Sequence, residues 1–320
     1  MIWSYLIHLN KCMWQTGDPD WAPNLKLSPQ DRQNETEKIM IDWELYDTFI
    51  KFLPTQGINT VLIDVGNGVR LERHPEICQK EAMTKDELKK MCDEIRALGM
   101  EPIPKLNFSC GHNPWMRQYR YMVGTDEYYR FCDDVIDEVA ELFGYPKYFH
   151  LGLDEEQALP NVRSGLWVFR APHIWWRDAF RLFKRCEHNN ARPWVWSDDY
   201  WHRPEEFLKN MPKSVLQSNW DYCPPRGLDE NGKYRHYGFQ SYVELEEHGY
   251  DQVPTCSTWL HDLNTDETFR LAKAHIAPER LKGIMTAPWD YIYEESFHLM
   301  MQEAVRFGTA KKKYFPQEDK

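Results

Sequence analysis

Short apolar runs alternate with longer amphipathic stretches along all 320 residues of the chain. Compact apolar runs predict strands, and apolar residues spaced three and four apart predict helices. The predicted strands span 3–9, 58–65, 101–108, 147–153, 193–198, 214–220, 252–258 and 282–288. The predicted helices span 41–55, 84–98, 125–143, 173–190, 204–210, 239–248, 265–276 and 294–307. Strict alternation of the two kinds of element predicts a parallel sheet that is covered by helices.

The ends of two helices are marked in the sequence. Thr84 can cap a helix, and Glu87 stands three residues later, which is the pattern of a capping box. Gly99 follows this helix as its C-terminal stop. Thr125 and Gly144 frame the next helix in the same way.

The number of units indicates the fold class. Eight strand–helix units in 320 residues give about 40 residues per unit, which is typical of a (β/α)8 TIM barrel. We predict one barrel domain over residues 1–310, followed by a C-terminal tail over 311–320. An open doubly wound sheet is the alternative. It would usually carry a glycine-rich turn after its first strand, where this chain has Asn10-Lys11-Cys12-Met13-Trp14.

Composition and charge limit the classes of partner that the protein is expected to bind. The net charge of -11 disfavours a nucleic-acid surface, which needs clustered basic residues. None of the eight cysteines forms a CxxC pair, so they are interpreted as reduced thiols. No stretch is long and apolar enough for a membrane span, and the N-terminus has no basic region of a signal peptide. We expect a cytoplasmic protein. An export signal that precedes residue 1 stays open, and the sequence does not indicate an oligomeric state.

Polar and aromatic residues collect where the predicted strands end. In a parallel barrel these carboxyl ends carry the chemistry. The candidate positions are Asn10, Asp64, Asn107, Asp154, Glu155, Asp198, Trp220, Asp221, Tyr222, Trp259, Trp289 and Asp290. Carboxylates and tryptophans dominate this set, and neither a phosphate-binding GxxxxGK[ST] loop nor a GxSxG nucleophile elbow occurs.

The fourth strand is the most informative, because it ends in three consecutive acids, Asp154, Glu155 and Glu156. Successive residues of a regular strand point to opposite sides, so the first two acids would reach a substrate from two directions. Cleavage of a glycoside needs an acid at the leaving oxygen and a second group at the anomeric carbon. The alternative interpretation is that these acids begin a helix, where negative charge is favourable.

Three segments carry a resemblance to a known family. HLGLDEE (150–156) is similar to the motif His-x-Gly-Gly-Asp-Glu, and PIPKLNFSCGH (102–112) to Pro-Glu-Ile-Asp-x-Pro-Gly-His. NTVLIDVGNGVRLERHPEI (59–77), followed by MTKDELKKM, resembles a strand, a Gly-x-Arg turn and a Tyr-Thr-x-x-Glu-Leu helix. These are motifs of glycoside hydrolase family 20, the β-N-acetylhexosaminidases, which the chain resembles best over residues 59–156.

The resemblance implies a retaining, exo-acting hydrolase in which the 2-acetamido group of the substrate is the nucleophile. Asp154 would orient this group, and Glu155 would act as general acid and base. No metal or organic cofactor is expected. The predicted substrate-binding residues are Asn107, His112, Trp196, Asp198, Trp220, Tyr222, Trp259, Trp289 and Asp290. Among them His112 would support the acid, while Trp196, Trp220 and Trp289 would surround the acetamido group with Tyr222 as hydroxyl donor.

The chain departs from the family pattern at several positions. Leu153 replaces a glycine, Lys105 and Asn107 replace acids, and Asp290 stands where the family has glutamate. The family's arginine after the first strand has no clear match near Asn10. These changes leave two alternatives open. One is a glycosidase for another sugar with Asp198 or Asp290 as protein nucleophile, and the other is a carbohydrate-binding barrel without turnover.

A metal site near the strand ends is a weaker hypothesis. His8, His202 and His261 lie near predicted strand ends and could join Asp154 or Asp198 around an ion. No HxH or HExxH spacing supports such a site.

Overall fold

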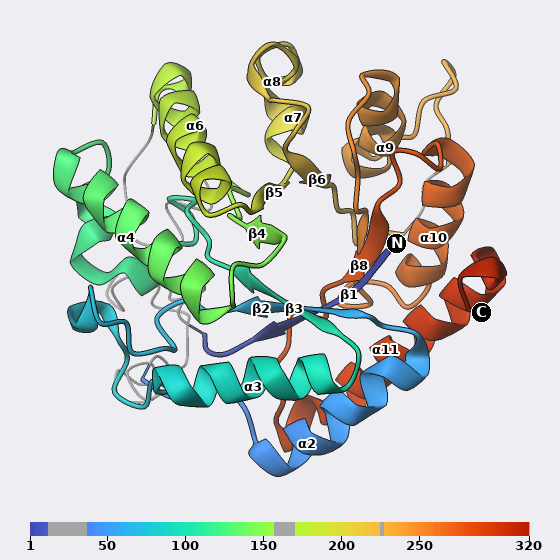
Figure 1. Ribbon diagram of the computed structural model, residues 1–320. Helices are drawn as coiled ribbons and strands as arrows, with labels where there is room; N and C mark the ends of the chain where they lie inside the picture. The colour runs from blue at the N-terminus through green and yellow to red at the C-terminus, as the bar shows by residue number, and fades with distance from the viewer. Residues whose placement is uncertain (12–36, 157–169, 225–226, 320) are drawn as a thin grey trace, which may run out of the picture.

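The computed structural model describes residues 1–11, 37–156, 170–224 and 227–319. These residues form a parallel sheet of eight strands surrounded by helices (Figure 1). The strands are β1 (Ile2–His8), β2 (Thr60–Asp64), β3 (Glu101–Lys105), β4 (Tyr148–His150), β5 (Arg192–Trp196), β6 (Leu216–Ser218), β7 (Thr255–Cys256) and β8 (Gly283–Thr286). The helices are α2 (Trp43–Phe52), α3 (Lys85–Ala97), α4 (Asp126–Leu142), α6 (Pro172–His188), α7 (Asp199–His202), α8 (Pro204–Asn210), α9 (Tyr237–Glu247), α10 (Asn264–His275) and α11 (Glu294–Tyr314). Four short 3₁₀ helices are η3 (Leu53–Gln56), η4 (Pro75–Ile77), η5 (Pro114–Tyr121) and η6 (Pro316–Asp319).

The sheet curls into a barrel that is nearly closed. β1 pairs in parallel with both β2 and β8, with Ile2 opposite Gly283 at the start of the second ladder. The seam between β6 and β7 is held by isolated bridges, of which one joins Trp220 to Thr255. The (β/α)8 fold predicted from the sequence is therefore confirmed, including the contact between the first and last strands.

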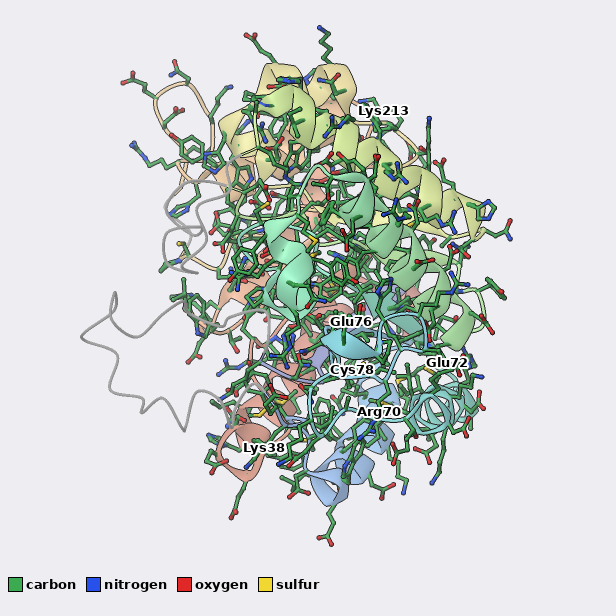
Figure 2. The ribbon with its side chains drawn as sticks, turned by 90° about the vertical axis from the view of Figure 1, so that its left-hand side faces the viewer. Lys38, Arg70, Glu72, Glu76, Cys78 and Lys213 are labelled. Atoms are coloured by element: carbon green, nitrogen blue, oxygen red, sulfur yellow. The ribbon has the colours of Figure 1, made fainter. Side chains whose placement is uncertain are left out.

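Successive side chains along a strand point to opposite faces of the sheet, and this alternation gives two separate apolar cores. The interior of the barrel holds an apolar cluster to which Leu6, Leu62 and Ile103 belong. Tyr5 and Ile7, the neighbours of Leu6 on β1, belong to the larger cluster that includes residues of the surrounding helices. Side chains thus fill the space between the strands and the helices (Figure 2).

The predicted helix ends at Thr84 and Thr125 are confirmed. The Thr84 side chain accepts a hydrogen bond from the Glu87 backbone N–H, and the Glu87 side chain accepts one from the Thr84 backbone N–H, so the capping box is complete. Thr125 caps α4 through the backbone N–H of Tyr128. Among the described helices, none has the length and apolar character needed to cross a membrane.

Several element boundaries differ from the predictions, and two of the differences bear on the site and on the domain end. β4 ends at His150, three residues early, because Gly152 and Leu153 have φ angles of 68° and 71°, which no strand accommodates. Helix α11 continues to Tyr314, so the predicted domain end at residue 310 falls inside a helix. Lys311 is buried there, with its ammonium group 5.4 Å from the centre of the Trp3 ring, and is not part of a solvated tail. Most of the segment between the first predicted strand and the first predicted helix lies outside the described residues.

Three buried polar side chains meet inside the barrel. The Lys105 Nζ atom lies 2.5 Å from Asp64 Oδ2, and His8 Nδ1 lies 3.3 Å from the same oxygen. Burial opposes ionisation of Asp64, but Lys105 and His8 outweigh it and lower the pKa of its carboxyl group. Lys105, which replaces an acid of the family motif, is therefore charge-balanced by the neighbouring strand.

We predict that Asp64→Asn lowers the free energy of unfolding by about 3–5 kcal/mol, because it leaves the buried Lys105 charge without its carboxylate. Urea unfolding measures the change. Asp47→Asn is the matched control, since Asp47 pairs with Lys51 at the surface, where both side chains are more than half exposed. Loss of that pair should change the free energy of unfolding by less than about 1 kcal/mol. Equal effects of the two substitutions would contradict the prediction.

Candidate active site

A cavity of about 550 Å³ opens near the carboxyl ends of the strands. Of the residues predicted from the sequence to be catalytic or to bind substrate, eight line it. They are His112, Asp154, Glu155, Trp196, Trp220, Tyr222, Trp259 and Trp289. As far as the described residues define the cavity, Asn107, Asp198 and Asp290 are not part of its lining.

The two acids follow an irregular turn that replaces the last residues of the predicted strand. Gly152, Leu153 and Glu155 all have φ angles between 51° and 71°. A Cβ atom on Gly152 would lie 2.1 Å from Asn107 Oδ1, so only glycine fits there. Because the chain is not extended here, Asp154 and Glu155 are not forced to opposite sides, and oxygen atoms of the two lie within 4.8 Å of each other. The expectation of two opposed directions assumed a regular strand, which this segment is not.

Two buried side chains stabilise this turn by accepting hydrogen bonds from its backbone. Asn107 Oδ1 accepts the backbone N–H of Leu153 at 3.2 Å, and Asn107 Nδ2 donates to Asp154 Oδ1 at 2.7 Å. Asp198 Oδ2 accepts the backbone N–H of Glu155 at 2.8 Å. Burial, followed by the charge of Asp154, raises the pKa of Asp198 well above its usual value. Both residues were predicted to contact substrate, and the structure places them behind the two acids.

His112 connects the two acids. Its Nε2 atom lies 3.0 Å from Glu155 Oε2 and 3.4 Å from Asp154 Oδ2. Burial opposes protonation of the ring, but the two carboxylates outweigh it and raise the pKa of His112 to about 9. The pKa of Asp154 is also raised, by burial, although the charge of His112 opposes this shift. The Glu155 side chain is 39% exposed and that of Asp154 is 11% exposed, so Glu155 is the more accessible acid.

Aromatic rings form much of the remaining wall. The Trp289 ring centre lies 5.9 Å from that of Trp196 and 6.1 Å from that of Tyr222. Trp220 stacks on Tyr222 with ring centres 5.2 Å apart. Trp259 is 64% exposed at the cavity, where it offers a free ring face.

Other predicted candidates have structural partners. Glu156 forms an ion pair with Arg170 at 2.8 Å, in which both side chains are buried. His150, interpreted as a barrel histidine or a metal ligand, packs against Trp194 and Trp196, and burial lowers its pKa well below the usual value. Asp290 Oδ1 accepts the backbone N–H of Tyr291 at 2.9 Å.

Several lining residues were not predicted from the sequence. They are Trp201, Asp221, Cys223, His236, Tyr237, Gly238 and Leu260. Trp201 belongs to the short helix α7 and Tyr237 begins α9, so neither stands at the end of a strand. Asp221 and Cys223 flank Tyr222. Asp221 was among the strand-end candidates, but nothing in the sequence assigned it or Cys223 a role in binding or catalysis.

We predict that Leu153→Gly is about 1 kcal/mol more stable than Leu153→Ala, because only glycine adopts a positive φ without steric cost. The two variants share the loss of the buried leucine side chain, so their difference isolates the backbone. Leu151 is the matched control, since it is buried but has no positive φ. There the order should reverse, with Leu151→Ala about 0.5–1 kcal/mol more stable than Leu151→Gly. Thermal unfolding of the four variants measures these differences in stability. The same order of the Gly and Ala variants at both positions would contradict the prediction.

We predict that His112 titrates near pH 9 in ¹⁵N-histidine NMR spectra, and that Glu155→Gln lowers this value because one carboxylate is lost. Since the pKa is raised on folding, His112 should contribute stability that is complete below about pH 6.5 and is lost as the pH rises through 9. The stability difference between the wild type and His112→Gln should follow this course. A His112 pKa at or below 6.5 would contradict the charge arrangement.

The matches to known proteins support the barrel fold. No protein-family profile matches the chain. A curated relative, hexosaminidase D of Bos taurus, is 25% identical over 57% of this chain, and the matched part spans 61% of the length of that relative.

Solved structures match a larger share of the chain. The β-N-acetylhexosaminidase of Bacteroides fragilis NCTC 9343 matches with a TM-score of 0.62 and 14% identity, covering 99% of this chain and 70% of that one. The GH20 β-N-acetylhexosaminidase of Streptomyces coelicolor A3(2) matches with a TM-score of 0.61 and 12% identity, covering 97% and 63%. The chain therefore has a divergent form of the glycoside hydrolase family 20 barrel fold.

Proposed function

We propose that the protein is a retaining, exo-acting glycoside hydrolase of the β-N-acetylhexosaminidase type. The observation that carries the proposal is the pair of adjacent acids, Asp154 and Glu155, bridged by His112 in a cavity with aromatic walls. The kinship with hexosaminidase D and the barrel shared with GH20 enzymes support the same class of reaction.

In the proposed first step, the acetamido oxygen of the substrate attacks the anomeric carbon as the bond to the leaving oxygen breaks. Glu155, the more exposed acid, donates its proton to that oxygen. Asp154 accepts the acetamido N–H, which holds the nucleophile in place and stabilises the positive charge that develops on it. In the second step, Glu155 takes a proton from water, which attacks the anomeric carbon from the side that the leaving group vacated. The bond between the anomeric carbon and the acetamido oxygen breaks in this step, and its electron pair restores the acetamido group.

The spacing of the acids supports retention. An inverting hydrolase places its two carboxyl groups about 6.5–9.5 Å apart so that a water molecule fits between them and the sugar. Here oxygen atoms of Asp154 and Glu155 lie within 4.8 Å of each other. This short distance differs from that of an inverting pair and suits an acid next to the group that orients the internal nucleophile.

His112 has an electrostatic role in this scheme. With a pKa of about 9, its ring is protonated at neutral pH. An imidazolium beside Glu155 stabilises the carboxylate that forms when the acid gives up its proton. Asn107, behind the turn, donates to Asp154 and keeps one of its oxygens in a fixed direction.

The aromatic wall fits the remainder of a sugar. Trp196, Trp289 and Tyr222 form a compact apolar surface beside the acids, which suits the methyl group and the apolar ring face of an N-acetylated hexose. The exposed rings of Tyr237 and Trp259 offer a second stacking surface toward solvent, where a leaving group would lie.

The alternative with a protein nucleophile has less support. Asp198 accepts a hydrogen bond from the Glu155 backbone N–H, and Asp290 accepts one from the Tyr291 backbone N–H. Neither acid belongs to the described lining of the cavity. A panel of aryl β-glycosides with and without the 2-acetamido group tests the choice. We expect turnover only of the acetamido sugars. Equal turnover of both sets would favour a protein nucleophile, and no turnover of any glycoside would favour a binding protein.

We predict that Glu155→Gln slows hydrolysis of natural glycosides about 10²–10⁴-fold but spares the first step on activated aryl glycosides, whose leaving oxygen needs little protonation. Asp154→Asn should slow both kinds of substrate by a similar factor, because it weakens the nucleophile. Steady-state and burst kinetics with the two substrate types provide the measurement.

Glu187→Gln is the matched control for these variants, because Glu187 is exposed on α6 and should leave both rates unchanged. Full activity of Glu155→Gln on every substrate that the wild type cleaves would refute the assignment of the acid.

A further inference from the structure

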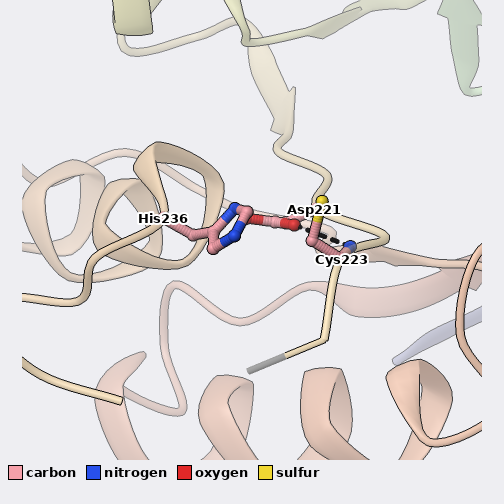
Figure 3. Close-up of side chains that lie close together, drawn as sticks. All are labelled: Asp221, Cys223 and His236. Carbon is pink, nitrogen blue, oxygen red and sulfur yellow. Dashed lines mark hydrogen bonds and ion pairs between the residues drawn. The ribbon is translucent and has the colours of Figure 1, made fainter. Parts of the chain in front are cut away.

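A second cluster of reactive side chains lies in the same cavity, apart from the acid pair. Asp221 and Cys223 follow strand β6, and His236 is the residue before α9 (Figure 3). All three line the cavity. Neither the proposed reaction nor the family motifs that the sequence resembles give these residues a role.

The cluster has the dimensions of a metal site. His236 Nδ1 lies 3.2 Å from Asp221 Oδ2, and one ligand atom from each of the three residues lies within 4.8 Å of the others. Zinc bonds of about 2.0–2.3 Å in a tetrahedron place neighbouring ligand atoms about 3.3–3.8 Å apart. The pair of Asp221 and His236 is close to this spacing, and the Cys223 ligand atom lies within 4.8 Å of both.

The framework around Asp221 is well fixed. Its Oδ1 atom accepts the backbone N–H of Cys223 at 2.9 Å, and its carbonyl oxygen accepts Asn264 Nδ2 at 2.5 Å. Gly238 permits the close approach of α9, because a Cβ atom there would lie 2.5 Å from Asp221 Cβ. Ligands that are held before an ion arrives lose little conformational freedom on binding it.

We propose that Asp221, Cys223 and His236 bind a divalent cation of the zinc class. A set of one thiolate, one imidazole and one carboxylate suits zinc, whereas magnesium and calcium prefer oxygen ligands alone. Three protein ligands leave the fourth position of a tetrahedron for water or for a group of the ligand in the cavity.

The acid pair is a poorer place for the same ion. His112, Asp154 and Glu155 also have ligand atoms within 4.8 Å of one another, but they offer no sulfur. The protonated ring of His112 already contacts both carboxylates, and an ion would have to displace its proton. Binding of the ion at one cluster or at the other would therefore give different results in the same titration.

Titration with Co²⁺, which replaces zinc and gives a near-ultraviolet charge-transfer band when bound to a thiolate, tests the site. We expect one Co²⁺ per chain, the charge-transfer band, and displacement of Co²⁺ by Zn²⁺. Cys223→Ser should abolish the band, and His236→Gln should weaken Co²⁺ binding at least tenfold. Circular dichroism confirms that the variants are folded, and the two substitutions affect separate segments, so both are not expected to fail together.

Cys78→Ser is the matched control. Cys78, labelled in Figure 2, is also a partly buried cysteine, but it follows η4 directly and does not belong to the described lining of the cavity. This variant should keep the band. The proposal is overturned if the wild type shows no thiolate band, if Cys223→Ser keeps it, or if Glu155→Gln rather than His236→Gln removes the bound ion.

A bound ion would narrow the cavity, and this consequence rests on the proposed function. Zn²⁺ should raise the KM of the wild type for an aryl N-acetylhexosaminide, and the ratio of KM with and without Zn²⁺ should return to one in Cys223→Ser. An unchanged KM in a protein that binds Co²⁺ would refute the coupling but not the site. Absence of all glycoside turnover would refute the proposed function, while the Co²⁺ titration would still decide the site.

Discussion

The candidate site depends on one break in the backbone. Strand β4 stops at His150, and the following turn, with positive φ at Gly152, Leu153 and Glu155, directs two neighbouring acids into one cavity. A regular strand would have sent them to opposite sides of the sheet. The turn persists because buried partners, Asn107 and Asp198, satisfy the backbone groups that leave the strand ladder. Loss of this geometry would separate the acids even if both remained in the sequence.

Charge balance is the second constraint. Buried acids are costly without a partner, and three of the described buried acids in and near the site have one. Asp64 meets Lys105, Glu156 meets Arg170, and Asp154 lies beside His112 and Asn107. Asp64 and Glu156 are paired with Lys105 and Arg170. The charge of His112 therefore acts on the two acids that face the cavity, Asp154 and Glu155. Its raised pKa is a consequence of that position.

The sequence predicted the features that depend on local pattern. Apolar periodicity located the eight strands, and the capping residues Thr84 and Thr125 fixed two helix starts. It did not predict the early end of β4, because a leucine with positive φ leaves no trace in hydrophobic pattern. It also missed Trp201 and His236, since these reach the cavity from a short helix and from the start of α9 rather than from strand ends. Asn107 was found, but it supports Asp154 instead of lining the cavity.

The departures from the family motif now have physical explanations. Leu153 stands where the family has glycine, at a φ of 71°, which costs about 1–2 kcal/mol for a residue with a Cβ atom. The side chain is only 2% exposed, and burial of a leucine contributes about 1.5–3 kcal/mol, so packing can offset the strained backbone. Lys105 is likewise offset by Asp64 on the adjacent strand. Both changes are thus compensated by neighbouring side chains. The residues around the two acids can therefore diverge from the family motif while Asp154 and Glu155 line the same cavity.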